Sequence, residues 1–335
     1  MSRFLERIIE RAKTDKKTIV LAEGNDVRTI KAAAMAIEQN VADIIILGEK
    51  ASILKMAEEE KVDISAATLI NPVEDVNFKD FVNKFYEMRK AKGLTPEKAE
   101  ETLKNTLYYG CMMVKNGVAD GMVAGACNSS SNVLRPALQI LKTAPGTKLV
   151  SAFFIMCVPD CEYGADGVFL FADSGLNENP DADAVSEIAI SSAKSFKTLV
   201  EEEPVIAMTS YSTYGSAKSE LVDKMQLATK LAKEKRPDLL LDGELQADAA
   251  IVPSVGASKA PGSPVAGKAN VLIFPDLNVG NTAYKLVQRL AKAEAYGPVT
   301  QGIARPVNDL SRGCSAEDIV GVIGITCVQA QNNAE

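Results

Sequence analysis

The 335-residue sequence contains no histidine. Histidine is the side chain that ordinarily titrates near neutral pH, so any acid–base step must use a carboxylate, lysine, cysteine, tyrosine or a group of the substrate. Ser-His-Asp catalysis, Cys-His catalysis and a histidine-ligated metal are therefore excluded. The six cysteines show no paired C-x-x-C spacing of the kind that binds zinc; they stand at positions 111, 127, 157, 161, 314 and 327. We expect no metal site.

Other common features are also missing. No apolar run approaches membrane-spanning length, and the first 17 residues are charged and amphipathic rather than signal-like. Scattered cysteines fit reduced thiols, so we expect a soluble, cytoplasmic protein. The net charge of -7 argues against nucleic-acid binding, and an anionic ligand would need a local basic cluster. Neither a Walker A motif nor a strand followed by G-x-G-x-x-G is present.

What the sequence does contain is an α/β pattern. Apolar runs alternate with amphipathic segments in the first half, which is typical of parallel βαβ units. Strands are predicted at 18–23, 42–48, 67–72, 119–126, 148–158, 167–173, 204–210 and 270–276. Helices are predicted at 27–39, 51–60, 78–92, 96–116, 183–199, 216–234 and 282–295. The Pro-, Ser- and Gly-rich stretch 252–269 is predicted to be a mobile surface loop.

Adjacent proline and glycine residues suggest where one domain ends and the next begins. LKTAPGTK (141–148) and AYGPVTQG (295–302) both contain such a pair. We therefore predict a discontinuous α/β domain of residues 1–143 plus 298–335, with a second α/β domain, residues 144–297, inserted in it. The sheets should be mainly parallel, and a ligand would be enclosed in a cleft between the domains.

The segment 308–331 joins a loop to a helical pattern. Apolar residues recur at helical spacing after Gly313, and Ser315 followed by Asp318 is a capping-box pattern. The first turn of a helix offers unpaired N–H groups and a positive dipole end, so with Arg312 before it this segment favours a phosphate or an oxyanion. Such a box often caps a helix without chemistry, and the spacing leaves both roles of Asp318 open.

Two further strand-to-helix turns have a related form. In 123–146 three serines precede a helix, which makes Ser130 and Ser131 candidate substrate contacts; such turns are also common as plain caps. In 274–290, Gly280 and Asn281 open a helix that carries Tyr284 and Lys285, and we treat these three polar side chains as candidate contacts as well.

Five segments in this order resemble phosphate acetyltransferase (phosphotransacetylase), and the resemblance covers the whole chain. They are LRPALQILKTAPG, YGSAKSELVDK, LDGELQADAA, FPDLNVGNTAYKLVQRL and NDLSRGCSAEDIV. The resemblance implies two α/β domains of the isocitrate and isopropylmalate dehydrogenase type, a homodimer, and reversible acetyl transfer between coenzyme A and phosphate. Coenzyme A would be a substrate, with no tightly bound cofactor, compatible with stimulation by a monovalent cation. Acetate kinase would be a pathway neighbour.

The resemblance also assigns roles. Asp318 would take the proton from the coenzyme A thiol, Arg312 would orient the phosphoryl group, and Ser311 would hydrogen-bond in the transition state. Arg89 and Arg135 would hold the coenzyme's phosphates.

Two cysteines, Cys161 and Cys314, match family cysteines near the site. Without a histidine to activate them, direct thiolate attack in a ternary complex is favoured over an acetyl-cysteine intermediate. Asn128 stands where many members have histidine, and Thr282-Ala283 replaces Ile-Gly.

Three alternatives remain. One is a butyryltransferase or another acyl specificity. The second is a non-catalytic acetyl-CoA-sensing module, which predicts loss of the catalytic residues, and all three are present. The third is a decarboxylating dehydrogenase, which needs clustered metal-binding aspartates. Asp242, Glu244 and Asp248 raise that question, but we interpret them as polar rim and interdomain contacts.

Overall fold

A computed structural model describes residues 2–332 of the chain. The chain divides into two compact units. Unit 1 is Met1–Phe4 with Gly146–Gly302, and unit 2 is Leu5–Pro145 with Ile303–Glu335. Within residues 2–332, no helix has both the length and the apolar character that crossing a membrane requires.

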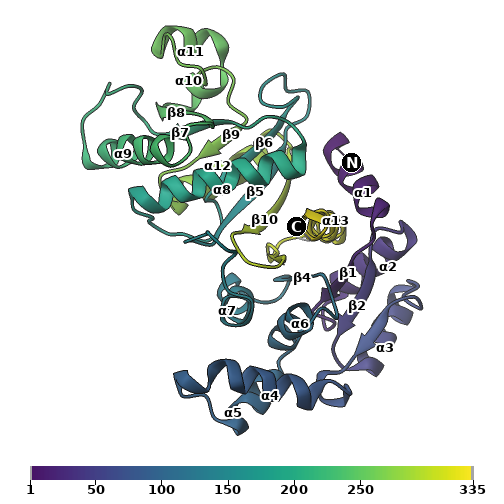
Figure 1. Cartoon of the computed structure of the whole chain (residues 1–335). Helices are drawn as coiled ribbons and strands as arrows, with labels where there is room; N and C mark the ends of the chain where they lie inside the picture. The colour runs from purple at the N-terminus through teal and green to yellow at the C-terminus, as the bar shows by residue number, and fades with distance from the viewer. Residues whose placement is uncertain (1, 333–335) are drawn as a thin grey trace. The chain divides into compact units, whose positions relative to one another are not determined.

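Unit 2 is built on a five-stranded sheet in which every strand pair is parallel. Three of its strands, β1, β2 and β4, are labelled in Figure 1. Its order is β11-β4-β1-β2-β3. The strands are β1 (Thr18–Leu21), β2 (Asp43–Leu47), β3 (Thr68–Ile70), β4 (Gly121–Ala124) and β11 (Val307–Asp309). The inner strands are buried and rich in Ile and Val, which is the composition of a parallel sheet covered on both faces.

Helices cover this sheet. They are most of α1 (Arg3–Thr14), then α2 (Val27–Glu38), α3 (Lys50–Glu60), α4 (Phe78–Arg89), α5 (Pro96–Leu103), α6 (Thr106–Lys115), α7 (Ser130–Ile140) and α13 (Ala316–Asn332), with short 3-10 turns η1 (Pro72–Glu74) and η2 (Lys90–Lys92). Helices α2 and α13 pack on each other, and so do α6 and α7. Helix α13 is buried along most of its length because its sequence is almost wholly apolar after the first turn.

Unit 1 contains a six-stranded mixed sheet of order β10-β5-β6-β9-β7-β8. The pairs β10–β5 and β5–β6 are antiparallel and the other three are parallel. The strands are β5 (Ser151–Cys157), β6 (Val168–Ala172), β7 (Val205–Thr209), β8 (Leu240–Leu245), β9 (Val271–Ile273) and β10 (Glu294–Gln301). The helices are α8 (Ala182–Val200), α9 (Glu220–Lys235), α10 (Ala247–Ile251), α11 (Pro253–Lys259) and α12 (Leu277–Leu290).

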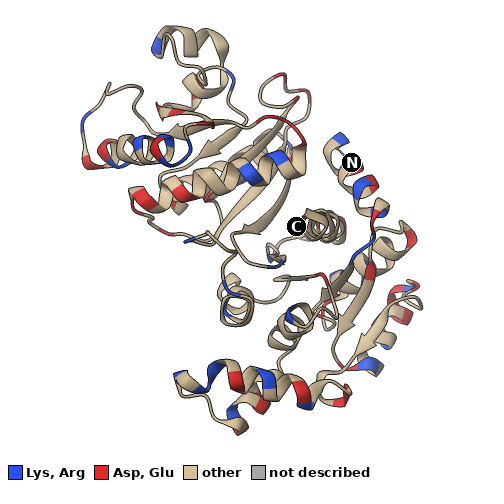
Figure 2. Ribbon diagram, in the orientation of Figure 1, with Lys and Arg blue, Asp and Glu red and all other residues tan. Residues whose placement is uncertain are grey.

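Helix starts follow local chemistry. Asp181, Ser219 and Asp276 each accept the N–H of the third residue of α8, α9 and α12 with their side chains. Charged residues lie mostly on the helices and loops of each unit, and the strands contain few, as the coloured ribbon of Figure 2 shows. The predicted α/β class with mainly parallel sheets is confirmed.

Three predictions about local structure were wrong. The predicted helix 96–116 is two helices, because Asn105 caps the start of α6 by accepting the N–H of Leu107 at 2.9 Å. The stretch 252–269 is not a loose loop: it contains α11, and Val265 and Ala269 are fully buried. Its small residues allow close packing, since a Cβ on Gly256 would lie 2.7 Å from the N atom of Gly267. The helix predicted at 282–295 ends at Leu290, and its last two residues belong to β10.

Candidate active site

Three loops of unit 2 follow neighbouring parallel strands. They are residues 22–26 after β1, 125–129 after β4 and 310–315 after β11. The carboxyl ends of parallel strands meet at one edge of a sheet, which is where open α/β sheets bind ligands. The predicted residues Ser130, Ser131, Ser311, Arg312, Cys314 and Asp318 all lie on these loops or on the helix starts that follow them.

A buried carboxylate holds the second loop. Glu23 is 2% exposed and accepts four consecutive backbone N–H groups, those of residues 125–128, at 2.7 to 3.2 Å. The side-chain amide of Asn128 also donates to it at 2.8 Å. Glu23 therefore already accepts the backbone donors of residues 125–128, and they are not available to a ligand.

An arginine ties all three loops together. Arg28 donates to both carboxylate oxygens of Asp26, to the carbonyl of Ala126 at 2.7 Å, and to the carbonyls of Arg312 at 2.8 Å and Cys314 at 3.1 Å. These bonds join segments about a hundred and almost three hundred residues apart in the sequence. Bidentate pairing with Asp26 raises the pKa of Arg28 and lowers that of Asp26.

The third loop contains the predicted capping box, and the structure confirms it. The N–H of Ser315 donates to Oδ2 of Asp318 at 2.9 Å, and the N–H of Asp318 donates to Oγ of Ser315 at 3.1 Å. Oδ1 of Asp318 accepts no hydrogen bond from residues 2–332. The residue is half-buried, and this second oxygen is not occupied by the cap.

The loop also positions a cation and a thiol. The carbonyl of Ser311 accepts the N–H of Cys314 at 2.9 Å, which closes a tight turn. Arg312, at the tip of this turn, is exposed, and its guanidinium has no hydrogen-bond or ion-pair partner in the part of the chain that the structure describes. Burial raises the pKa of the Cys314 thiol to about 11, so this cysteine is protonated at neutral pH.

The two arginines assigned to the coenzyme's phosphates both affect the pKa of the same tyrosine, Tyr108. Burial raises the pKa of Tyr108, and the positive charges of Arg135 and Arg89 partly offset that rise. Tyr108 also donates its hydroxyl to Gln139 at 3.3 Å. Within residues 2–332 neither arginine has a carboxylate partner. Arg89 ends α4 and Arg135 lies on α7, and both helices pack against α6, which carries Tyr108, so both positive charges act near this side chain.

Three residues of this region were missed by sequence reasoning: Glu23, Arg28 and Asp309. Asp309 ends β11 and is 1% exposed, and neither of its carboxylate oxygens has a hydrogen-bond partner among the described residues. A signal was available for Glu23, which is an acid at the end of an apolar run, whereas the residues before Asp309, IARPVN, form no such run. Without the strand order, however, nothing indicates that these two acids are neighbours.

The remaining predicted residues lie in unit 1. Tyr284 is 5% exposed and its ring stacks on Phe154 with centroids 3.8 Å apart, so it belongs to the core. This leaves Asn281 and Lys285 as the groups of α12 that a ligand can reach. The amide of Asn281 donates to the carbonyl of Ser174 at 3.3 Å, and Lys285 is exposed. Cys161 is half-buried and packs against the same core.

Two of the three acids of 241–248 do not form a polar rim, whereas Asp248 is exposed. Asp242 and Glu244 are buried, at 3% and 1% exposed. Asp242 accepts from Tyr214, Ser263 and Lys233, and although burial raises its pKa, these bonds hold it below the usual value. Asp248 pairs with Lys259 at 2.8 Å. These acids stabilise unit 1, and no group of three or more potential metal ligands occurs within residues 2–332.

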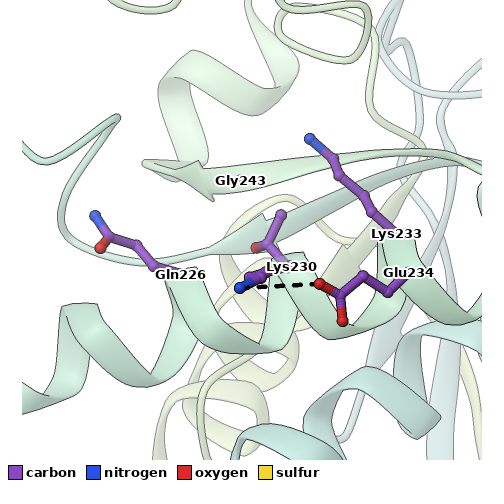
Figure 3. Close-up of a pocket in the computed structure, with 6 residues that line it drawn as sticks. Gln226, Lys230, Lys233, Glu234 and Gly243 are labelled. Carbon is purple, nitrogen blue, oxygen red and sulfur yellow. Dashed lines mark ion pairs between the residues drawn. The ribbon is translucent and has the colours of Figure 1, made fainter.

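A pocket of about 420 Å³ lies beside this cluster (Figure 3). Its lining contains two lysines, but Lys233 pairs with Asp242 at 2.7 Å and Lys230 with Glu234 at 3.9 Å. Its positive charge is thus compensated, unlike that of Arg312. We assign it no ligand. The other lining residues are Gln226, Thr229 and Gly243.

Comparison with known proteins supplies the class of the fold. The structure of a putative 4-hydroxythreonine-4-phosphate dehydrogenase from Salmonella typhimurium superposes with a TM-score of 0.50 at 12% identity, covering 94% of this chain and 99% of that one. At this identity the likeness concerns the fold alone. It confirms the predicted dehydrogenase-like architecture.

Closer relatives define the family. A phosphate acetyltransferase of Acetivibrio thermocellus is 64% identical over 328 residues, which cover 98% of each chain. A phosphotransacetylase structure from Streptococcus pyogenes superposes with a TM-score of 0.92 at 43% identity, covering 99% of this chain and 100% of that one. Residues 3–327 match the family model described as Phosphate acetyl/butaryl transferase. The chain belongs to this family of acyltransferases.

Proposed function

We propose that this enzyme transfers an acetyl group reversibly between coenzyme A and inorganic phosphate by direct attack of the coenzyme's thiolate on acetyl phosphate. The observation that carries the proposal is the loop before α13. It presents an unpaired guanidinium on Arg312, a hydroxyl on Ser311 and an unoccupied carboxylate oxygen on Asp318 within eight residues. These groups match the needs of a reaction that releases phosphate and must remove a thiol proton.

In the proposed step, Asp318 accepts the thiol proton through Oδ1 while Oδ2 remains bound to the N–H of Ser315. The sulfur–carbon bond forms, a tetrahedral oxyanion appears, and the carbon–oxygen bond to phosphate then breaks. Arg312 holds the leaving phosphate as a bidentate donor, and Ser311 donates to the developing charge. The proton can pass from Asp318 to the released phosphate.

Several groups are proposed to hold the substrates. Arg89 and Arg135 are suited to the coenzyme's phosphates because their charges are uncompensated and act on one place near Tyr108. Ser130 and Ser131, at the start of α7, are proposed donors to the phosphate of acetyl phosphate. Asn281 and Lys285, on α12, stay proposed substrate contacts.

A covalent acetyl-cysteine is disfavoured. Burial raises the pKa of Cys314 to about 11, and local desolvation together with the charge of Glu23 raises that of the exposed Cys127 to about 12, so neither is a thiolate near neutral pH. Cys127 additionally faces the negative charge of Glu23 at 3.3 Å. Both cysteines are better described as structural groups of the loops.

The acyl specificity is proposed to be acetyl, as in the name of the 64% identical relative. Asn128, which replaces a histidine common in the family pattern, turns its amide to Glu23. Thr282 is exposed and Ala283 packs in the core of unit 1, so neither removes a proposed catalytic group.

The decisive experiment supplies acetyl phosphate and coenzyme A and follows thioester formation in the ultraviolet. Propionyl and butyryl phosphates are tested in parallel at the same concentrations. Acetyl-CoA formation with the highest kcat/KM for acetyl phosphate supports the proposal. A higher kcat/KM for butyryl phosphate would make the chain a butyryltransferase, and no thioester with any of the three would favour a sensing module.

We further propose a cytoplasmic homodimer that works beside acetate kinase. A surface of α12 supports the dimer, because Val279, Leu286 and Leu290 are exposed and recur at intervals of seven and four residues on one helical face. Light scattering coupled to gel filtration tests it. A mass of one chain, near 35.7 kDa, at all concentrations would contradict the dimer.

A further inference from the structure

Asp309 is a buried acid that the proposed reaction does not use. It ends β11, is 1% exposed, and within residues 2–332 neither of its oxygens accepts a hydrogen bond of normal geometry. Glu23, equally buried nearby, accepts four backbone N–H groups and one amide. Buried polar groups ordinarily have partners, so the contrast between the two acids requires an explanation.

The surroundings of Asp309 are built closely around it. Gly125 has φ +114 and passes so near that a Cβ on it would lie 2.1 Å from Oδ1 of Asp309. Only glycine therefore fits at this point of the loop. The Ser130 hydroxyl and the Leu310 N–H lie near enough to favour the charged carboxylate, but neither forms a hydrogen bond with it in the structure.

Opposing influences act on the proton of Asp309. Burial raises its pKa, the donors Ser130 and Leu310 lower it, the negative charge of Glu23 raises it, and the positive charge of Arg312 lowers it. Burial dominates, and the pKa of Asp309 is raised to about 7. Arg28, the other cation of these loops, is paired with Asp26 and not with Asp309.

We propose that Asp309 is a positioning residue that turns the Ser130 hydroxyl toward or away from a bound phosphate dianion by gaining or losing a proton. The inference rests on the proposed function, in which Ser130 donates to the phosphate of the substrate. Ser130 is the first residue of α7 and Asp309 is the last residue of β11, and β4, which leads into α7, is the neighbour of β11 in the sheet.

In this proposal the Ser130 hydroxyl rotates to form one hydrogen bond with Asp309, and the two states differ in the direction of that bond. Neutral Asp309 carries an O–H that donates to Oγ of Ser130, so the Ser130 proton is free to be donated to an anion. Ionised Asp309 instead accepts the Ser130 proton, and the serine then offers an anion only lone pairs. The proton exchanges with solvent, and no covalent bond to carbon or phosphorus changes. Anion binding should therefore be stronger below the pKa of Asp309 than above it.

Protonation of Asp309 should also make the stability of the folded protein depend on pH. The pKa of Asp309 in the folded state is above the unfolded value of about 3.9. Between these two values the folded state retains a proton that the unfolded state has released. The contribution of Asp309 to stability is therefore full below about pH 4, falls as the pH rises, and is lost above about pH 7.

The test measures binding of sulfate, a phosphate analogue whose charge is constant across this range, by calorimetry on the full chain at about pH 6 and about pH 8. Asp309→Asn, Asp309→Leu and Ser130→Ala are compared with the unaltered protein. The unaltered protein should bind sulfate roughly three- to tenfold more weakly at the higher pH, the scale of one hydrogen bond.

Each variant has its own expected result. Asp309→Asn carries a permanent amide donor, so its sulfate affinity should match the low-pH value of the unaltered protein at both pH values. Asp309→Leu and Ser130→Ala should bind weakly at both. In activity assays, the KM for acetyl phosphate should vary among the variants as the sulfate affinity does, while kcat changes little. A pH response retained by Asp309→Asn or by Ser130→Ala would overturn the proposal.

Failure of the proposed function can be distinguished from failure of the inference about Asp309. Sulfate binding and unfolding by circular dichroism need no turnover, so the Asp309 response can be present in a protein that makes no acetyl-CoA. Asp309→Asn should remove the fall in unfolding midpoint between about pH 4 and pH 7, whereas Ser130→Ala should retain most of it. If Asp309→Asn does not fold, Ser130→Ala alone decides through its sulfate response.

Discussion

Ser315 and Asp318 bind each other's backbone N–H groups at the start of α13, at 2.9 and 3.1 Å. This reciprocal box occupies one oxygen of Asp318 and leaves the other without a partner among residues 2–332. The cap thus fixes the orientation of the Asp318 carboxylate, and Oδ1 remains available to accept a proton. Capping and proton transfer are compatible roles for one side chain here.

The first prediction separates those roles. Asp318→Asn should retain most of the cap through its amide oxygen, and therefore the fold, yet lower kcat by about a hundredfold or more, the usual scale for loss of a general base. Cys314→Ala should lower kcat little. Both are measured at saturating substrate. Near-normal turnover in Asp318→Asn with abolished turnover in Cys314→Ala would instead indicate covalent catalysis.

The second prediction concerns the shape of the cation at the tip of the loop. Arg312→Lys should lower kcat by at least about tenfold, since an ammonium group cannot form the two parallel bonds of a guanidinium to phosphate. The unfolding midpoint should not move, because the Arg312 side chain has no partner in the described part of the chain. Unchanged kcat would remove Arg312 from the proposed mechanism.

The third prediction tests the arginine pair near Tyr108. Arg89→Gln and Arg135→Gln should each raise the KM for coenzyme A by about tenfold while leaving that for acetyl phosphate within about twofold. Each should also weaken competition by 3'-phosphorylated analogues more than by dephosphorylated ones. Arg236→Gln, an exposed arginine paired with Asp238 in unit 1, is the matched control. Equal effects on both substrates would contradict the assignment.

The fourth prediction follows from the residues available to coordinate a metal ion. The sequence has no histidine and no paired cysteines, so no ligand set for a catalytic divalent metal is expected. Full activity should persist after treatment with a strong chelator, and potassium or ammonium can still stimulate. Loss of activity that only a divalent metal restores would show that a metal takes part.

The fifth prediction concerns stability. Glu23→Gln replaces an acceptor of five hydrogen bonds by an amide whose NH2 group faces N–H donors, and should reduce the free energy of unfolding by about 2 to 4 kcal/mol. Glu10→Gln, an exposed acid paired with Lys13, should cost less than about 0.5 kcal/mol. Urea denaturation measures both. Equal costs would show that the buried acceptor is dispensable.

Much of the local structure was predictable from sequence. The alternation of apolar runs and amphipathic segments identified the α/β class, and the S-x-x-D spacing identified the box at the start of α13. Each of these features depends on residues a few positions apart. Composition misled at 252–269, because glycine, serine and proline serve a mobile loop and a tightly packed turn equally well.

The sequence by itself therefore determined the fold class, the helix caps and the types of chemical group that can act without histidine. Tertiary structure alone decided which groups meet. The order β11-β4-β1 brings Glu23, Gly125 and Asp309 together, although the same alternation of strands and helices would arise from another order. Strand order depends on how whole helices pack across the sheet, and that free energy is distributed over contacts between residues far apart in the chain.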